Sequence, residues 1–131
     1  MAAPNILNLN TATGKTTAFT PSGTSAVVLL QNAASSGKVF KVNSLIASNL
    51  SGASSVAATV SYYTNGGVAQ GSAPSGGTAF SLATGVIVPA TASLIVIDKT
   101  TEYYVEENAS LVVTSSSANN LTFSVSYEEL S

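Results

Sequence analysis

The 131-residue chain contains no cysteine, histidine, tryptophan or arginine. Without cysteine there is no disulfide and no thiol nucleophile, and without histidine neither a Ser-His-Asp triad nor a Cys/His zinc site can be built. Because these residue types carry most enzymatic chemistry, we expect a protein that is not an enzyme, with no catalytic residue, no metal site and no cofactor site.

Charge is also scarce. Four lysines and six acidic residues give a net charge of −2, and charged residues make up 8% of the chain, about a third of the usual fraction. So few cations cannot neutralise a row of phosphates, so we expect no nucleic-acid partner. The sequence Gly14-Lys15-Thr16 matches the tail of a phosphate-binding loop, but the required first glycine is replaced by Leu9.

Long apolar runs are missing as well. The longest extend over four or five residues, as in 26–30, which is too short to cross a bilayer. The first residues contain neither a basic segment nor an uninterrupted apolar core, so we expect no targeting segment. The sequence therefore predicts no membrane partner.

What the chain does contain is a succession of short β-rich runs separated by turn residues. Alternating apolar and polar residues in 56–63 and 121–128 predict strands with one buried face. No stretch has helical periodicity, so we expect almost no helix. The sequence predicts an all-β domain over 24–131, a single antiparallel β-sandwich of seven or eight strands with Greek-key or jelly-roll connections. The expected strands are 25–32, 38–49, 55–64, 79–88, 92–98, 102–106, 110–115 and 121–129.

Residues 1–23 show neither the alternation of a strand nor the periodicity of a helix, and they contain several prolines and glycines. This predicts an N-terminal arm or an irregular lead-in. Its apolar residues Ile6, Leu7 and Leu9 need cover. Either a partner subunit or the flank of the same domain could provide it.

Two runs, 26–30 and 94–97, are apolar on both faces. In a sandwich, one face of each strand is normally exposed to solvent and polar. Because both faces are apolar in these runs, the arm, a long loop or another subunit should cover the second face. A weakly charged surface also favours association. We therefore expect a symmetric homo-oligomer, such as a trimer. The candidate contact residues are Ile6, Leu7, Leu9, Val27, Leu29, Ile95, Ile97 and Tyr63.

Other patterns support weaker alternatives. The glycine-rich segment 65–77 is interpreted as a mobile, exposed connection. Tyr63 could stack on a sugar ring, which would make the chain a carbohydrate-binding attachment module. A serine activated by Lys41 would need a lysine with a lowered pKa, but alternation directs Lys41 outward, away from its apolar neighbours. The pairs at 106–107 and 128–129 are interpreted as solubilising charges, because adjacent strand residues point to opposite faces.

Four segments of the later chain resemble small β-rich virion structural proteins of tailed bacteriophages, especially those that infect cyanobacteria. The segments are 41–49 (KVNSLIASN), 88–99 (VPATASLIVIDK), 104–111 (YVEENASL) and 125–130 (VSYEEL). The resemblance extends over roughly 24–131, leaves the segment 65–77 unplaced, and contains no catalytic signature.

The resemblance implies a non-enzymatic virion component that is made in the host cytoplasm. A capsid decoration or cement protein is the first expectation, with the major capsid protein or other virion proteins as partners. A neck, tail or fibre component is the alternative.

Overall fold

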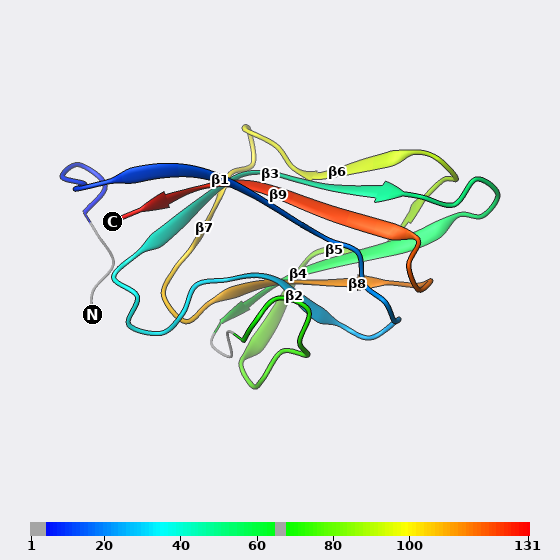
Figure 1. The fold of residues 1–131 in the computed structure, drawn as a ribbon, viewed down its shortest axis with the longest axis horizontal. Helices are drawn as coiled ribbons and strands as arrows, with labels where there is room; N and C mark the ends of the chain where they lie inside the picture. The colour runs from blue at the N-terminus through cyan, green and yellow to red at the C-terminus, as the bar shows by residue number, and fades with distance from the viewer. Residues whose placement is uncertain (1–4, 65–67) are drawn as a thin grey trace.

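A computed structural model describes residues 5–64 and 68–131, which form nine β-strands and no helix (Figure 1). The strands are β1 (Ala12–Phe19), β2 (Val27–Gln31), β3 (Val39–Asn49), β4 (Val56–Thr64), β5 (Thr78–Val88), β6 (Ser93–Ile97), β7 (Tyr103–Val105), β8 (Ser110–Ser115) and β9 (Leu121–Leu130). The all-β prediction is confirmed, whereas the predicted count of seven or eight strands is wrong. Among the described residues, no helix could cross a membrane.

The strands form two antiparallel sheets. In the first sheet the order is β1-β9-β3-β6, and β7 pairs with β3 beyond the end of β6; in the second sheet the order is β2-β8-β4-β5. Figure 1 shows the first sheet above the second. Each of the eight strands predicted from the sequence is present, with ends that differ by at most two residues.

The additional strand is β1, which lies inside the segment expected to be an irregular arm. It pairs with β9 along its whole length, from Ala12 opposite Leu130 to Phe19 opposite Phe123. Only Thr17 and Phe19 of β1 are partly buried. An edge strand with so little buried surface has no apolar alternation, which is why the sequence pattern did not indicate it. The Gly14-Lys15-Thr16 sequence lies in this strand and not in a loop.

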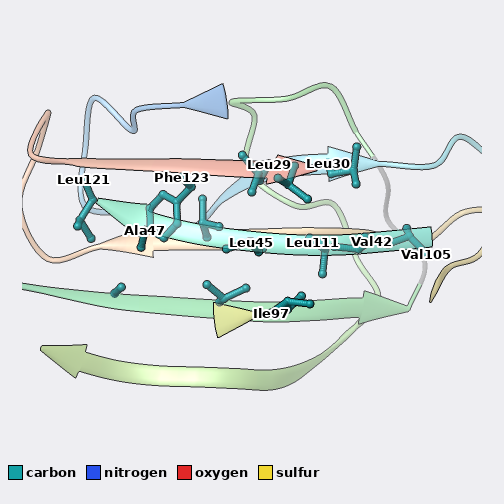
Figure 2. Close-up of a cluster of buried hydrophobic side chains, with 14 of the residues drawn as sticks. Leu29, Leu30, Val42, Leu45, Ala47, Ile97, Val105, Leu111, Leu121 and Phe123 are labelled. Carbon is teal, nitrogen blue, oxygen red and sulfur yellow. The ribbon is translucent and has the colours of Figure 1, made fainter. Parts of the chain in front are cut away.

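The inner faces of the two sheets share one hydrophobic core (Figure 2). In β9 the side chains of Leu121, Phe123 and Val125 are fully buried, and in β4 those of Val56, Ala58 and Val60 are buried as well. Both alternating patterns predicted from the sequence are confirmed. Phe123 is among the largest fully buried side chains, so it contributes strongly to the stability of the fold.

Candidate interaction surface

The predicted contact residues separate into buried and exposed groups. Leu29 and Ile97 are 1% exposed and belong to the shared core, and Val27 packs against it. Their burial therefore needs no second molecule, and neither Leu29 nor Ile97 is accessible to a partner in this fold. By contrast, Ile95 lies on the outer face of β6 and is 63% exposed. The core therefore accounts for the apolar residues Leu29 and Ile97, whereas Ile95 stays exposed to solvent.

The free edge of β2 is bound by the chain itself. Val28 is fully buried, donates its N–H to the carbonyl of Ser72 (2.9 Å) and accepts from the N–H of Gly71 (2.8 Å). The amide of Gln70 also donates to the carbonyl of Leu29 (2.9 Å). Residues 70–72 of the glycine-rich connection are therefore bound to the free edge of β2. The expected exposure holds for Gln70 and Ser72, but this part of the connection is anchored by hydrogen bonds, and residues 65–67 lie outside the described residues.

The same contacts close one side of the molecule. A Cβ on Gly71 would lie 3.0 Å from Cζ of Phe19, so the connection packs closely against β1 as well as β2. Gln70 further donates to the hydroxyl of Thr17 on β1 (3.0 Å). Because β1 and β2 are the edge strands of the two sheets on this side, the connection bridges both edges.

The N-terminal residues hold exposed apolar side chains beside the C-terminus. The N–H groups of Asn10 and Thr11 both donate to the carbonyl of Ser131, at 2.7 and 3.0 Å. Before this anchor, Ile6 and Leu7 are exposed, Leu7 to 95%, while Leu9 is partly buried. The flank of the domain leaves about half of the Ile6 side chain and nearly all of the Leu7 side chain accessible to a partner.

A larger group of exposed apolar side chains lies on the opposite side, where β5 is the edge of the second sheet and β6 and β7 are the edge of the first. Nine large apolar side chains are exposed in the described part of the chain, and six belong to these three strands. We call these six residues the edge surface: Phe80, Val86, Ile87, Ile95, Tyr103 and Tyr104.

Sequence reasoning found Ile95 in this surface but missed Phe80, Val86 and Ile87 as contact residues. The run 79–88 was correctly predicted as a strand, but alternation does not say whether a strand is central or at an edge. That distinction depends on the strand order, which brings β5 to the edge by pairing it with β4 alone. A signal was present in the composition, since β5 has none of the charged residues that can protect an edge strand.

Charged residues gather towards the end of the molecule that holds the C-terminus. Glu129 accepts from Lys15 (2.9 Å) and Lys38 (2.7 Å), and so connects β9 with β1 and with the residue before β3. On the other face of the sheet, Lys41 pairs with Glu102 at 3.1 Å and with Glu128 at 3.9 Å. Hydrogen bonds from Lys38 and Lys15 hold the pKa of the Glu129 carboxyl below its usual value.

We expect the Glu129 ion pairs to give a pH-dependent contribution to stability. Because its pKa is lowered in the folded protein, the contribution is present above about pH 4.5, the unfolded value, and is lost as the pH falls through the folded value. Glu129→Gln should lower the free energy of unfolding by about 1 kcal/mol at pH 7, because the pairs are partly exposed to solvent.

Urea unfolding followed by circular dichroism between pH 3 and 7 checks this expectation. Glu107→Gln removes one negative charge from the β7–β8 connection, where no ion pair with Glu107 is found among the described residues, and serves as the control. The difference between Glu129→Gln and the wild type should shrink towards pH 3; a constant difference across this range would contradict the assignment to the ionised carboxylate.

The opposite end of the molecule has no charged residue. It is made by the four connections 20–26, 50–55, 89–92 and 116–120, at the right of Figure 1, which we call the loop end. In fact, the chain contains no charged residue from Val42 to Ile97. The loop end consists of small, hydroxyl and amide residues around Leu50, whose side chain is 57% exposed.

Backbone hydrogen bonds join these four connections. Asn119 N–H donates to Pro21, Leu50 N–H to Asn120, and Thr91 N–H to Ser51, with distances from 2.7 to 3.0 Å. Buried Asn49 adds side-chain bonds to the carbonyls of Ser54, Val88 and Pro89. The loop end is therefore a preorganised surface whose shape depends on few flexible side chains.

The patterns considered for chemistry do not assemble into a reactive site. The hydrogen bond with Glu102 raises the pKa of Lys41, the opposite of the shift that a lysine general base requires. Glu128 and Glu129 lie on opposite faces of the sheet with different lysine partners, as alternation predicts. Tyr63 is half-buried on β4. Among the described residues, no group of three or more acidic side chains could hold a metal ion.

The geometry thus presents three surfaces for contact: the N-terminal segment, the edge surface and the loop end. Comparison of the chain with protein-family models and with curated proteins finds no match.

Proposed function

We propose that this chain is a non-enzymatic virion structural protein, a decoration or cement protein that lies on the phage capsid and binds the major capsid protein. The observation that carries the proposal is the loop end. Interfaces between proteins are depleted of charged residues at their centre, and the loop end can lose its water without burying a charge.

The rigidity of this end supports the same role. Binding costs free energy for each side chain and loop that becomes ordered. At the loop end the connections are already joined by backbone hydrogen bonds, as for Leu50 with Asn120 and Thr91 with Ser51. A protein held on a shell by such surfaces stabilises it through many repeated contacts, since multivalent attachment is far tighter than each single contact.

We also infer that the two sheets form a jelly-roll sandwich. With the three-residue β7 set aside, the remaining eight strands are distributed between the sheets in the order expected for two interleaved Greek keys. Jelly rolls build viral capsid and lectin domains among others. The topology therefore agrees with a virion component, although fold alone does not determine function.

Co-sedimentation tests the proposal. Purified chain is added to expanded capsids from phage grown without its gene, and in parallel to isolated tails. We expect binding to capsids only. Binding to tails alone would assign the chain to the neck, tail or a fibre, and binding to neither would overturn the proposal.

A variant at the loop end makes this test specific. Leu50→Lys adds a charge at an exposed position of the loop end, and we expect a loss of capsid affinity of about tenfold or more, since burying an unpaired charge is costly. Ala34→Lys adds the same charge at an exposed position in the β2–β3 connection, outside the loop end, and should bind like the wild type. Equal binding of both variants would contradict the assignment of the loop end.

A further inference from the structure

We propose that the edge surface binds a second copy of this chain, so that the protein forms a dimer about a twofold axis that runs past the middle of β5. This inference adds a partner to the proposed function and does not require capsid binding. It rests on the exposure of the edge surface, on its charge, and on the state of the other strand edges.

The first observation is the uncovered and uncharged edge of β5. Natural proteins shield edge strands with lysines, prolines, bulges or covering loops. Of these devices β5 has only the irregular pairing with β4, and it has neither charge nor proline over its eleven residues. Phe80, Ile87 and Ile95 are each more than half exposed along this side. On the other side of the molecule, residues 70–72 cover the edge of β2. Because the edge of β2 is covered and the edge of β5 is not, we expect self-association on the side of β5.

The distribution of charge favours a second copy of this chain as the partner of the edge surface. Within β5 and β6 there is no charge that could repel the same surface of another copy. The adjoining β6–β7 connection, residues 98–102, carries Asp98, Lys99 and Glu102; the charges of Asp98 and Lys99 cancel, and Glu102 is paired with Lys41 of β3. In an antiparallel twofold dimer the charged end of one copy lies beside the uncharged loop end of the other. Because β5 extends over about 36 Å at the rise of a strand, the two negative ends stay beyond the range of screened repulsion.

The shape of β5 explains why such an association would stop at a dimer and not continue into a longer assembly. Its pairing with β4 is interrupted between Ala58 and Val60 and again between Val60 and Ser61, and Gly85 has a positive φ of 56°. Bulges of this kind bend an edge and limit continuous strand pairing. The contact therefore depends on apolar side chains at a defined place. A twofold contact uses the same surface on both copies, so it leaves no second site from which a fibre could grow.

Light scattering coupled to size exclusion tests the proposal at protein concentrations up to 100 μM. We expect the wild type to have twice the 13.1 kDa mass of the chain. The double variant Ile87→Lys/Ile95→Lys places charges within the edge surface and should be monomeric. Leu7→Lys, at the most exposed apolar position of the N-terminal segment, should remain dimeric. Circular dichroism checks that all three proteins are folded.

Because the chain has no cysteine, a single introduced thiol locates the axis. Thr84→Cys lies near the middle of β5 and should be cross-linked to its copy by a short bismaleimide, whereas Leu7→Cys should not. A monomeric wild type, or a folded double variant that remains dimeric, would overturn the proposal. If a monomeric wild type binds capsids and the double variant does not, the edge surface belongs to the capsid contact, and the dimer proposal fails while the proposed function stands.

Discussion

Replacing Phe123 with alanine is expected to lower the free energy of unfolding by about 3–5 kcal/mol. Phe123 is fully buried in the middle of the first sheet, where its strand β9 pairs with β1 at Phe19 and with β3 at Ala47. Removing the ring loses its burial and leaves a cavity that neighbouring strands cannot fill completely. A domain of this size has a total stability of about 5–15 kcal/mol, so this single change should bring the protein near its unfolding threshold.

Urea unfolding monitored by circular dichroism at pH 7 measures the effect of Phe123→Ala. Leu7→Ala also truncates a large apolar side chain, but at a position that is 95% exposed, and should change the free energy of unfolding by less than about 0.5 kcal/mol. If the two variants were equally stable, Phe123 could not occupy the core described above.

Replacing Asn49 with alanine is expected to lower the free energy of unfolding by about 2–4 kcal/mol, because its buried amide forms hydrogen bonds with several backbone groups at once. Asn49 is 4% exposed. Its side-chain nitrogen donates to Ser54 (2.8 Å) and Val88 (2.9 Å), and its oxygen accepts from the N–H of Ser51 (2.9 Å). The variant leaves these groups without partners and releases the connections 50–55 and 89–92 from each other.

Asn49→Ala should therefore act locally as well as globally. We expect lower stability in urea and faster amide hydrogen exchange at Ser51 and Thr91, whose backbones bond across the loop end. Asn119→Gly is the control, since Asn119 is an exposed loop-end residue with a positive φ of 61° that glycine tolerates. Normal exchange in Asn49→Ala would contradict the role of this side chain in ordering the loop end.

Among the strands that were predicted correctly, the pattern is clearest in those with one buried face. In β9 and β4 the apolar residues recur at every second position, and the buried side chains follow that pattern from Leu121 to Val125 and from Val56 to Val60. The first strand was missed for the converse reason. It pairs with one neighbour only, and because most of its side chains are exposed, neither face needs to be apolar.

The candidate surfaces were less predictable because they depend on which strands become neighbours. The apolar runs around Leu29 and Ile97 both suggested a second covered face. Leu29 and Ile97 belong to the shared core, and what the chain covers in β2 is its free edge, through backbone groups of Gly71 and Ser72. Hydrogen bonds from glycine and serine backbone leave no side-chain pattern in a sequence. Likewise, the absence of charge at the loop end becomes visible only when the topology brings its four separate connections together.

The most direct test is an electron cryomicroscopy map of the native phage particle in which this chain is located. Our account predicts the chain on the outer surface of the head, with the loop end around Leu50 against the major capsid protein and the edge surface around Ile87 against a second copy. A particle that lacks the chain, or a chain bound to the head with its loop end turned towards solvent, would contradict it.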